Sequence, residues 1–445
     1  MKVVVIHTPG RNTPSLRSTI EAKNASKFAR FLPSIVVVDE TDKDITFLMA
    51  YRIWKRYVQP SRTVKRPGNV GHPWYNRWGY SSFDGTAFAV WKLSKSTHEI
   101  TVLLDKIPSI GNSKIDMRLV RSPTGPPNTY VATYNTFGKL NPLKRSEDYH
   151  AMSNKLRPKC FHMVDPKTKK VNYTPSAKTL QKAGLTPQEH MDSYCTFQNV
   201  TTIQFSPSLV PSFGKTSLVC PRHHKRVEKN ISMYVDDKNR IGYHYSINPW
   251  TILRPGCEPT TYSSTLFQKV VDFYDPFTPD YFAKIMQFSC STPLIPYGSD
   301  TLLAAGHFKI KYDHIDKFPP KSPARLFCKR LMRSLKIRSF SAKYEGIIHY
   351  EFIYGTFLYT VHKKTMRLHR ASNAFIVFDN KKPNSLMFPC GLAASSRDAT
   401  FYMSYHENDI NMKMLTMTSN EVDRMLVHNN RTTTPETFQF EIIHA

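Results

Sequence analysis

Residues Met117 to Asn135 read MRLVRSPTGPPNTYVATYN, and this pattern recurs along the chain. An apolar segment over Met117–Val120 is followed by a turn rich in proline and glycine over Ser122–Asn128 and a second apolar segment over Tyr130–Asn135. Proline, glycine and asparagine favour tight turns, and short apolar runs on both sides of such a turn are typical of antiparallel strands. The stretch therefore predicts a β-hairpin.

Four further segments repeat the order of apolar strand, polar turn, and strand rich in small and aromatic residues. Their strands are Ile35–Val38 with Phe47–Arg52, Ile231–Val235 with Ile241–Ser246, Pro293–Ile295 with Leu302–His307, and Leu386–Gly391 with Phe401–His406. Repeated antiparallel hairpins with small residues on a closely packed strand are typical of propellers, whose inner strands line a central channel. We therefore expect an all-β fold, a five-bladed β-propeller.

The second strand of every copy closes on a polar side chain. These residues are Arg52, Asn135, Ser246, His307 and His406. Because they occupy the same position in each copy, a shared register would bring them together at the centre of the ring.

The spacing between the copies predicts the domain organisation. Residues 1–34 form an N-terminal extension, and 35–445 form a single propeller with insertions at about 139–198 and 311–342. We expect three helices outside the hairpins: one at Thr186–Glu189, one starting at Thr418, and a basic amphipathic helix over Pro323–Arg338.

The charge balance indicates an anionic partner. Lys and Arg number 62 against 34 Asp and Glu, which gives a formal net charge of +28. Such an excess attracts nucleic acid, anionic lipid, phosphate-bearing substrates or an acidic protein, while a solvated basic surface is an equally valid interpretation. No apolar run reaches the length of a membrane span, so we expect no transmembrane segment.

Seven cysteines are spread along the chain without any C-x-x-C pair. This odd number and wide spacing predict free, buried thiols in the cytoplasm or another reducing intracellular compartment. The apolar run of MKVVVIHTPGR is too short for the core of a signal peptide, so we expect a protein that is not secreted by that route.

Searches for cofactor and metal motifs exclude several chemistries. Phe213–Thr216 resembles the end of a phosphate-binding loop, but Leu209 stands where its first glycine would be. Cys220–His224 offers ligand types for zinc without a second ligand pair nearby. We therefore expect neither a metal nor an organic cofactor.

The segments next to the hairpins resemble motifs of glycoside hydrolase family 130, the five-bladed β-mannoside phosphorylases and related hydrolases. Ile115-Asp116-Met117-Arg118 is similar to the E-D-P-R segment of the family, and Glu228-Lys229-Asn230-Ile231 is similar to its E-K-N-W segment. Two later motifs follow in the same order: Ser291–Pro293 with Ala305–His307 resembles G-T-P with Y-H-G, and Phe388–Gly391 with Ser404–Asp409 resembles F-P-C/S-G with Y-Y-G-x-x-D.

The resemblance implies an inverting reaction on β-mannosides or related glycans, with inorganic phosphate as nucleophile and one carboxylic acid as proton donor. When the roles of the family's motif residues are transferred to the matching positions of this sequence, the resemblance implies that Asp116 is the general acid. The implied phosphate and sugar contacts are Arg52, Arg118, Lys229, Asn230, His307 and Asp409. A hydrolase would need a second carboxylate about 6.5 to 9.5 Å from the acid, for which Glu228 and Glu407 are candidates.

Departures from the family pattern keep a second hypothesis open. Ile115, Met117 and Ile231 replace the glutamate, proline and tryptophan of the motifs, and the last motif lacks its glycine. The alternative is a catalytically inactive basic propeller that binds nucleic acid or a virion-type protein partner. The long basic insertions and low glycine content resemble divergent relatives encoded by large DNA viruses.

Overall fold

A computed structural model describes strands, the shorter turns between them and three helices. The described residues are 3–7, 28–55, 84–110, 115–139, 194–220, 230–263, 265–276, 278, 284–311, 318–335, 352–378, 387–407 and 411–444. The expected helix at Thr186–Glu189 lies outside them, as does most of the insertion at 139–198.

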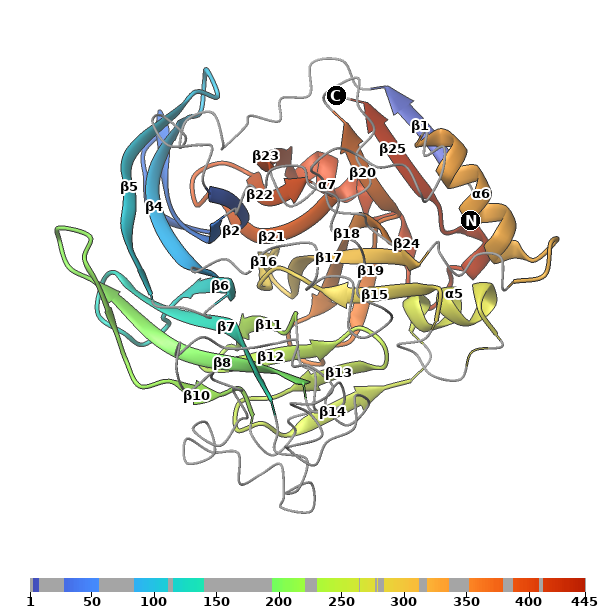
Figure 1. Cartoon of the computed structure of the whole chain (residues 1–445), viewed down its shortest axis with the longest axis horizontal. Coiled ribbons are helices and arrows are strands. Elements are labelled where there is room, and N and C mark those ends of the chain that lie inside the picture. Colours follow the sequence, from blue (N-terminus) through green and yellow to red (C-terminus); the bar gives the residue numbers. More distant parts are fainter. Residues whose placement is uncertain are drawn as a thin grey trace, which may run out of the picture.

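The fold is an all-β propeller arrangement, in which sheets surround a common centre (Figure 1). All five predicted hairpins are present, as the pairs β2–β3, β6–β7, β11–β12, β16–β17 and β21–β22. Turn chemistry is a local property, which is why the sequence alone located these turns.

Four separate sheets are antiparallel and have three to five strands each. The first contains β2 (Phe28–Glu40), β3 (Asp44–Lys55), β4 (Asp84–Ser94) and β5 (Ile100–Ile110). The second contains β6 (Ile115–Arg121), β7 (Thr129–Lys139), β8 (Tyr194–Phe205), β9 (Pro211–Phe213) and β10 (Ser217–Leu218). The third contains β11 (Ser232–Val235), β12 (Ile241–Ser246), β13 (Trp250–Leu253) and β14 (Pro259–Tyr262), and the fourth contains β21 (Met387–Ala394), β22 (Thr400–Glu407) and β23 (Asn411–Thr418).

The remaining sheet has nine strands and corrects the prediction of five blades. It contains β1 (Val3–His7), β15 (Met286–Cys290), β16 (Ile295–Tyr297), β17 (Thr301–Lys311), β18 (Phe352–His362), β19 (Leu368–Ala371), β20 (Ala374–Phe378), β24 (His428–Asn429) and β25 (Phe440–His444). Its strands β1, β25 and β20 pair in parallel, unlike a propeller blade, which is an antiparallel meander. The described residues therefore form four blades and one larger mixed sheet.

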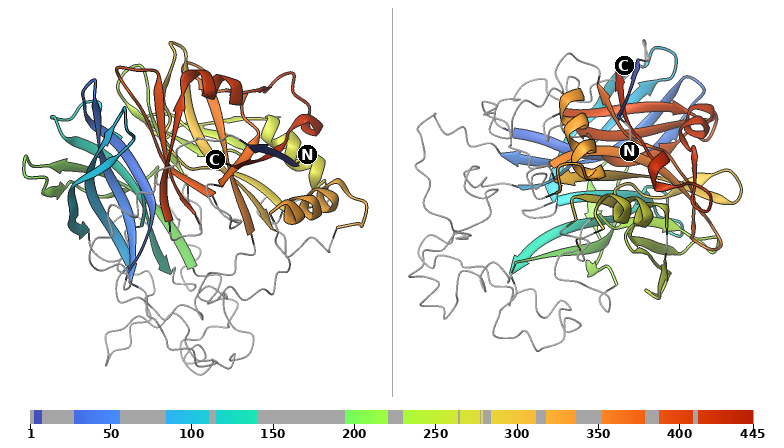
Figure 2. Two further views of the ribbon diagram at one scale, coloured as in Figure 1. Left: turned by 90° about the horizontal axis from the view of Figure 1, so that it is seen from above. Right: turned by 90° about the vertical axis from the view of Figure 1, so that its right-hand side faces the viewer.

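The strand β1 comes from the segment predicted as an N-terminal extension. It pairs with β25 over its whole length and lies beside α6, the helix Pro323–Ser334, as Figure 2 shows. The division at residue 34 stays a prediction.

The inner strands of the sheets pack closely against one another around the centre. The backbone nitrogen of Leu119 in β6 donates to Ser34 Oγ in β2 at 3.1 Å, and that of Leu294, just before β16, donates to the Met233 carbonyl in β11 at 2.8 Å. A Cβ atom added to Gly391 in β21 would overlap the backbone nitrogen of Ile35 in β2. The small residues of the repeats thus allow this close approach.

Aromatic side chains fill the space between neighbouring sheets. The rings of Phe47 and Trp91 stack with centroids 4.6 Å apart, and Tyr402 of the last blade meets Phe47 edge-on at 5.2 Å. Tyr134 and Tyr405 are buried as well, whereas Tyr245 is half-buried. These packed rings join the first and last blades.

Three helices connect or cover the sheets. The helix α7 (Ser419–Met425) has the capping box expected from Thr418 and Glu421, and α6 begins after the N-cap Ser322 with a proline in its first turn. The face of α6 that carries Phe327 and Leu331 is buried in the main core. A third helix, α5 (Leu266–Tyr274), was not expected from the sequence, and η7 (Pro435–Thr437) is a single 3-10 turn.

Among the described residues, no helix combines the length and apolar character that a membrane crossing requires.

An ion pair of half-buried side chains connects the first and last blades. Lys95 Nζ donates to Glu40 Oε1 at 2.6 Å and to Asp398 Oδ2 at 2.8 Å, while the backbone nitrogen of Ser396 donates to Glu40 Oε2 at 2.7 Å. Burial opposes the ionisation of Glu40, but hydrogen bonds from Lys95, Ser395 and Ser396 outweigh it and lower its pKa to about 2. We call this group, Glu40, Lys95, Ser395, Ser396 and Asp398, the closure cluster.

Two cysteines contradict the prediction of free thiols. Cys220, after β10, and Cys257, in the turn between β13 and β14, form a disulfide between the second and third blades. At a sequence separation of 37, the two cysteines form no recognisable pair in the sequence. Cys290 and Cys328 are free and buried as predicted, and Cys390 is buried as well. The predicted compartment stays a prediction.

This disulfide makes a testable contribution to stability. Replacing both Cys220 and Cys257 by serine is expected to lower the free energy of unfolding by about 3 kcal/mol, because the crosslink restricts the unfolded chain. Urea unfolding of wild type and variant, with and without reductant, measures it. Reductant should lower the free energy of unfolding of the wild type and leave that of the double variant unchanged. If reductant did not change the stability of the wild type, the crosslink would be contradicted.

Candidate functional site

The carboxylate of Asp116 lies at an irregular point of the inner strand β6. The pairing of β6 with β7 shifts register between Ile115 and Arg118, and Asp116 has a φ of +56°. A β-bulge redirects side chains, and left-handed backbone is uncommon outside glycine although aspartate tolerates it best. Such strained positions concentrate at functional sites.

Two side chains from other strands converge on this carboxylate. Arg52 Nη1, from β3, donates to Asp116 Oδ1 at 3.2 Å, and Asn135 Nδ2, from β7, donates to Asp116 Oδ2 at 3.0 Å. The side chains of Asp116 and Arg52 are 15% and 18% exposed, so solvent still reaches the pair. Two of the five strand-closing residues thus meet at the predicted acid.

A second set of contacts starts two residues further along β6. Arg118 is buried, and its Nε donates to the carbonyl of Ser291 at 2.6 Å while Nη1 donates to the carbonyl of Met117 at 3.1 Å. No carboxylate of the described residues lies within 4.0 Å of it. Carbonyl partners do not neutralise a guanidinium, so Arg118 retains a full positive charge there.

His307 extends this set to the last blade. Its Nδ1 lies 2.8 Å from Ser291 Oγ, and its ring packs on Phe388 of β21 with centroids 4.3 Å apart. His406 packs on Phe388 as well, at 5.2 Å, and Tyr354 lies near His307 at 5.8 Å. Aromatic rings beside polar groups are what a sugar-binding surface needs, because sugars present both C–H faces and hydroxyls.

We call this group of residues, from β3, β6, β7, β17, β18, β21, β22 and the position just after β15, the axial cluster. Its members are Arg52, Asp116, Arg118, Asn135, Ser291, His307, Tyr354, Phe388 and His406. It can bind an anion through its guanidinium groups, and a proton can move at the Asp116 carboxyl.

Other predicted residues lie elsewhere or outside the described part of the chain. Ser246 donates to the Pro249 carbonyl at a bulge of β12. Asn230 lies two residues before β11, half-buried, with a φ of +60°. Glu407 ends β22, paired with Met387. Glu228, Lys229 and Asp409 lie outside the described residues.

The sequence interpretation did not assign a site role to Tyr354, Phe388 or Asn135. Phe388 stood within a matched motif and Asn135 among the strand-closing residues, so both carried a signal. Tyr354 belongs to β18, which was not one of the repeated hairpins, and only the pairing of His307 with Thr356 brings it near.

Comparisons with known proteins give only weak likenesses to solved structures. No family model and no curated protein matches the chain. Among solved structures, β-1,2-mannobiose phosphorylase from Listeria innocua has a TM-score of 0.42 at 9% identity, covering 92% of this chain and 96% of that one. MPT-1, a GDP-Man-dependent mannosyltransferase from Leishmania mexicana, has a TM-score of 0.40 at 10% identity, covering 96% and 92%.

A sialidase from Trypanosoma rangeli is also similar, with a TM-score of 0.33 at 9% identity, over 95% of this chain and 61% of that one. TM-scores this low do not establish a shared fold or activity. The propeller arrangement therefore rests on the sheets themselves.

Proposed function

We propose that the protein acts on a glycan at the axial cluster, with a β-mannoside or related glycoside as substrate and inverting phosphorolysis or hydrolysis as reaction. The observation that supports this most is the position of Asp116. A bulged, left-handed residue of an inner strand brings its carboxylate to Arg52 and Asn135 of two neighbouring strands, where solvent still reaches it.

In this proposal Asp116 is the general acid. The Asp116 carboxylate accepts both of its hydrogen bonds, from Arg52 and Asn135. Asp116 must therefore be protonated before it can donate a proton to the leaving-group oxygen. Asn135 and Arg52 fix the orientation of the carboxyl, which is the positioning that proton transfer requires.

The buried charge of Arg118 supports inorganic phosphate as the nucleophile. Within the described residues its partners are the carbonyls of Ser291 and Met117, and a guanidinium without a carboxylate partner is suited to bind an oxyanion. In phosphorolysis, phosphate attacks the anomeric carbon, the bond to the leaving oxygen breaks, and that oxygen takes the proton of Asp116. Lys229, Asn230, His307 and Asp409 remain proposed phosphate or sugar contacts, and Glu228 or Glu407 would activate water in a hydrolase.

The test is to incubate the protein with β-linked mannobiosides, with and without inorganic phosphate, and to identify the products by proton and phosphorus NMR. We expect an α-configured sugar phosphate that forms only with phosphate, because inversion of a β-linkage gives the α-anomer. Reducing sugar formed equally without phosphate would assign hydrolysis. Neither product, with no heat of binding for any β-mannoside, would contradict the proposal.

A further inference from the structure

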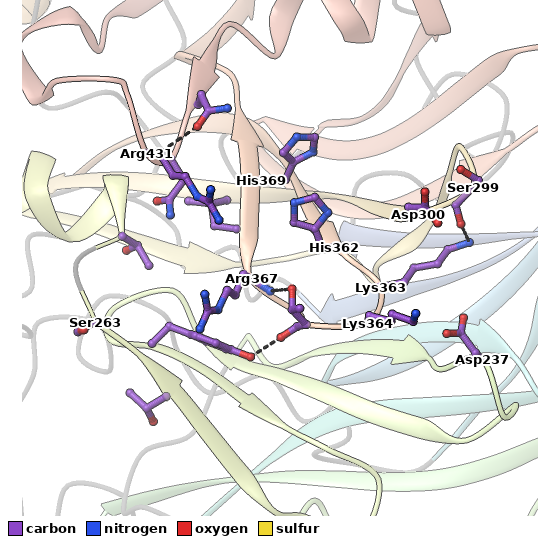
Figure 3. A pocket seen from close by; sticks show the side chains of 17 residues that line it. Asp237, Ser263, Ser299, Asp300, His362, Lys363, Lys364, Arg367, His369 and Arg431 are labelled. Carbon is purple, nitrogen blue, oxygen red and sulfur yellow. Dashed lines mark hydrogen bonds between the residues drawn. The ribbon is translucent and has the colours of Figure 1, made fainter.

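A cavity lies away from the axial cluster, toward the other ends of β17 and β18. Its volume is about 1180 Å³, and it is bordered by the turn from β18 to β19, the turn from β16 to β17, the segment after β14 and the residues after β24 (Figure 3). His362, at its edge, pairs with Thr301, six residues before His307 in β17. At about 3.3 Å per residue, roughly 20 Å separates the two sites.

The described lining of this cavity carries more positive than negative charge. Lys363, Lys364, Arg367 and Arg431 line it together with two carboxylates, Asp237 and Asp300. None of these four cations lies within 4.0 Å of a carboxylate in the part of the chain that the structure describes. Cations that gather without carboxylate partners leave a local potential that attracts anions.

Backbone hydrogen bonds hold these cations in place. In the β18–β19 turn, the backbone nitrogen of His362 donates to the Arg367 carbonyl at 3.0 Å, and that of Lys363 donates to the Asp300 carbonyl at 2.9 Å. On the other side, the backbone nitrogen of Arg431 donates to Asn429 Oδ1 at 2.9 Å. The positive groups therefore project from fixed turns.

The side chains facing the cavity are ordered in the same way. The Arg367 guanidinium lies 5.3 Å from the centroid of the Tyr262 ring, and Lys363 Nζ donates to the Ser299 carbonyl at 2.7 Å. The rings of His362 and His369 pack with centroids 4.4 Å apart. Burial, then the neighbouring His362 and Arg370, lower the pKa of His369, as expected for an imidazole in positive surroundings.

We propose that this cavity binds a small ligand with several phosphate groups, such as a polyphosphate or a polyphosphorylated metabolite. Three cations on the β18–β19 turn face Arg431, which follows β24, and together they match an anion that carries charge at several points, whereas a single carboxylate would neutralise one of them. A neutral glycan has no need of these charges. The cavity volume admits a ligand of nucleotide size.

The test measures binding of inorganic tripolyphosphate to the full chain by calorimetry in low salt. Reversing two charges in the cavity, Lys364→Glu with Arg431→Glu, is expected to weaken binding by at least about tenfold. The control, Lys329→Glu with Arg330→Glu on the exposed face of α6, makes the same change in net charge outside the cavity and should alter binding by less than about twofold. Adding ATP in a separate arm shows whether a nucleoside increases affinity.

Equal loss of binding in both double variants, or no binding to wild type, would overturn the proposal. Binding of short duplex DNA without any binding of tripolyphosphate would do so too, since it would assign the charge to a polymer. A second measurement does not depend on the variants folding: tripolyphosphate should protect Lys364 of the wild type from acetylation, detected by mass spectrometry, and leave Lys329 unprotected. Equal acetylation of Lys364 with and without the probe would count against the site.

Discussion

Replacing Asp116 by asparagine is expected to lower the turnover of a β-mannoside by about 10² to 10⁴-fold, because asparagine has no proton to give to the leaving group. Its amide oxygen still accepts from Arg52, so the fold should keep its stability. Initial rates at saturating substrate measure the effect. Binding of the glycan should change much less than turnover, which separates the loss of an acid from the loss of a binding group.

The matched control for this variant is Asp39→Asn. Asp39 is exposed on β2, so the same chemical change there should leave turnover within about twofold of wild type. If Asp116→Asn kept its activity while Asp39→Asn did too, Asp116 would not be the acid, and the other carboxylates of the chain would have to be tested in its place.

The Glu40→Gln variant should lose about 2 kcal/mol of stability at pH 7, because the folded pKa of Glu40 is about 2, its ordinary value is 4.5, and nearby water screens part of this effect. A depressed pKa stabilises the fold above pH 4.5, and this contribution is lost as the pH falls through the folded value. The wild type should therefore weaken between pH 4.5 and 2 more steeply than the variant. Urea unfolding at pH 7 and pH 3 measures both effects.

The control for the closure cluster is an exposed pair between the same turns. Arg397 Nη1 lies 2.7 Å from Asp42 Oδ1, and the Asp42 side chain is 86% exposed. Exposed pairs contribute little, so Asp42→Asn should change stability by less than about 1 kcal/mol. If both variants lost the same stability, or if Glu40→Gln were as stable as wild type, the closure cluster would not hold the first and last blades together.

Local sequence signals predicted much of the fold. The turns after Ile35–Val38 and Met117–Val120, and the capping box at Thr418, depend on neighbouring residues, so the sequence alone placed them correctly. The periodicity of apolar residues and the type of turn do not indicate which strands, distant in the sequence, pair with each other. The parallel addition of β25 to β20 and of β1 to β25 gave no local signal, and β1 and β25 lie more than four hundred residues apart in the sequence.

The candidate site was predictable to a similar degree. Asp116, Arg52 and Asn135 were singled out by motif or by position in the repeats, and the structure brings the three together. The bulge that redirects Asp116 was not predictable, because it depends on how β6 pairs with β7. The Cys220–Cys257 disulfide and the partners of Lys95 likewise arise from tertiary contacts between blades.

The most direct test of the proposed function is a crystal structure of the Asp116→Asn variant soaked with a β-mannobioside and phosphate. We expect the glycosidic oxygen within hydrogen-bond distance of residue 116, a sugar ring against Phe388 or Tyr354, and phosphate near Arg118. A glycan bound away from β6 and β21, or an axial cluster without ligand at concentrations where calorimetry shows saturation, would contradict the account.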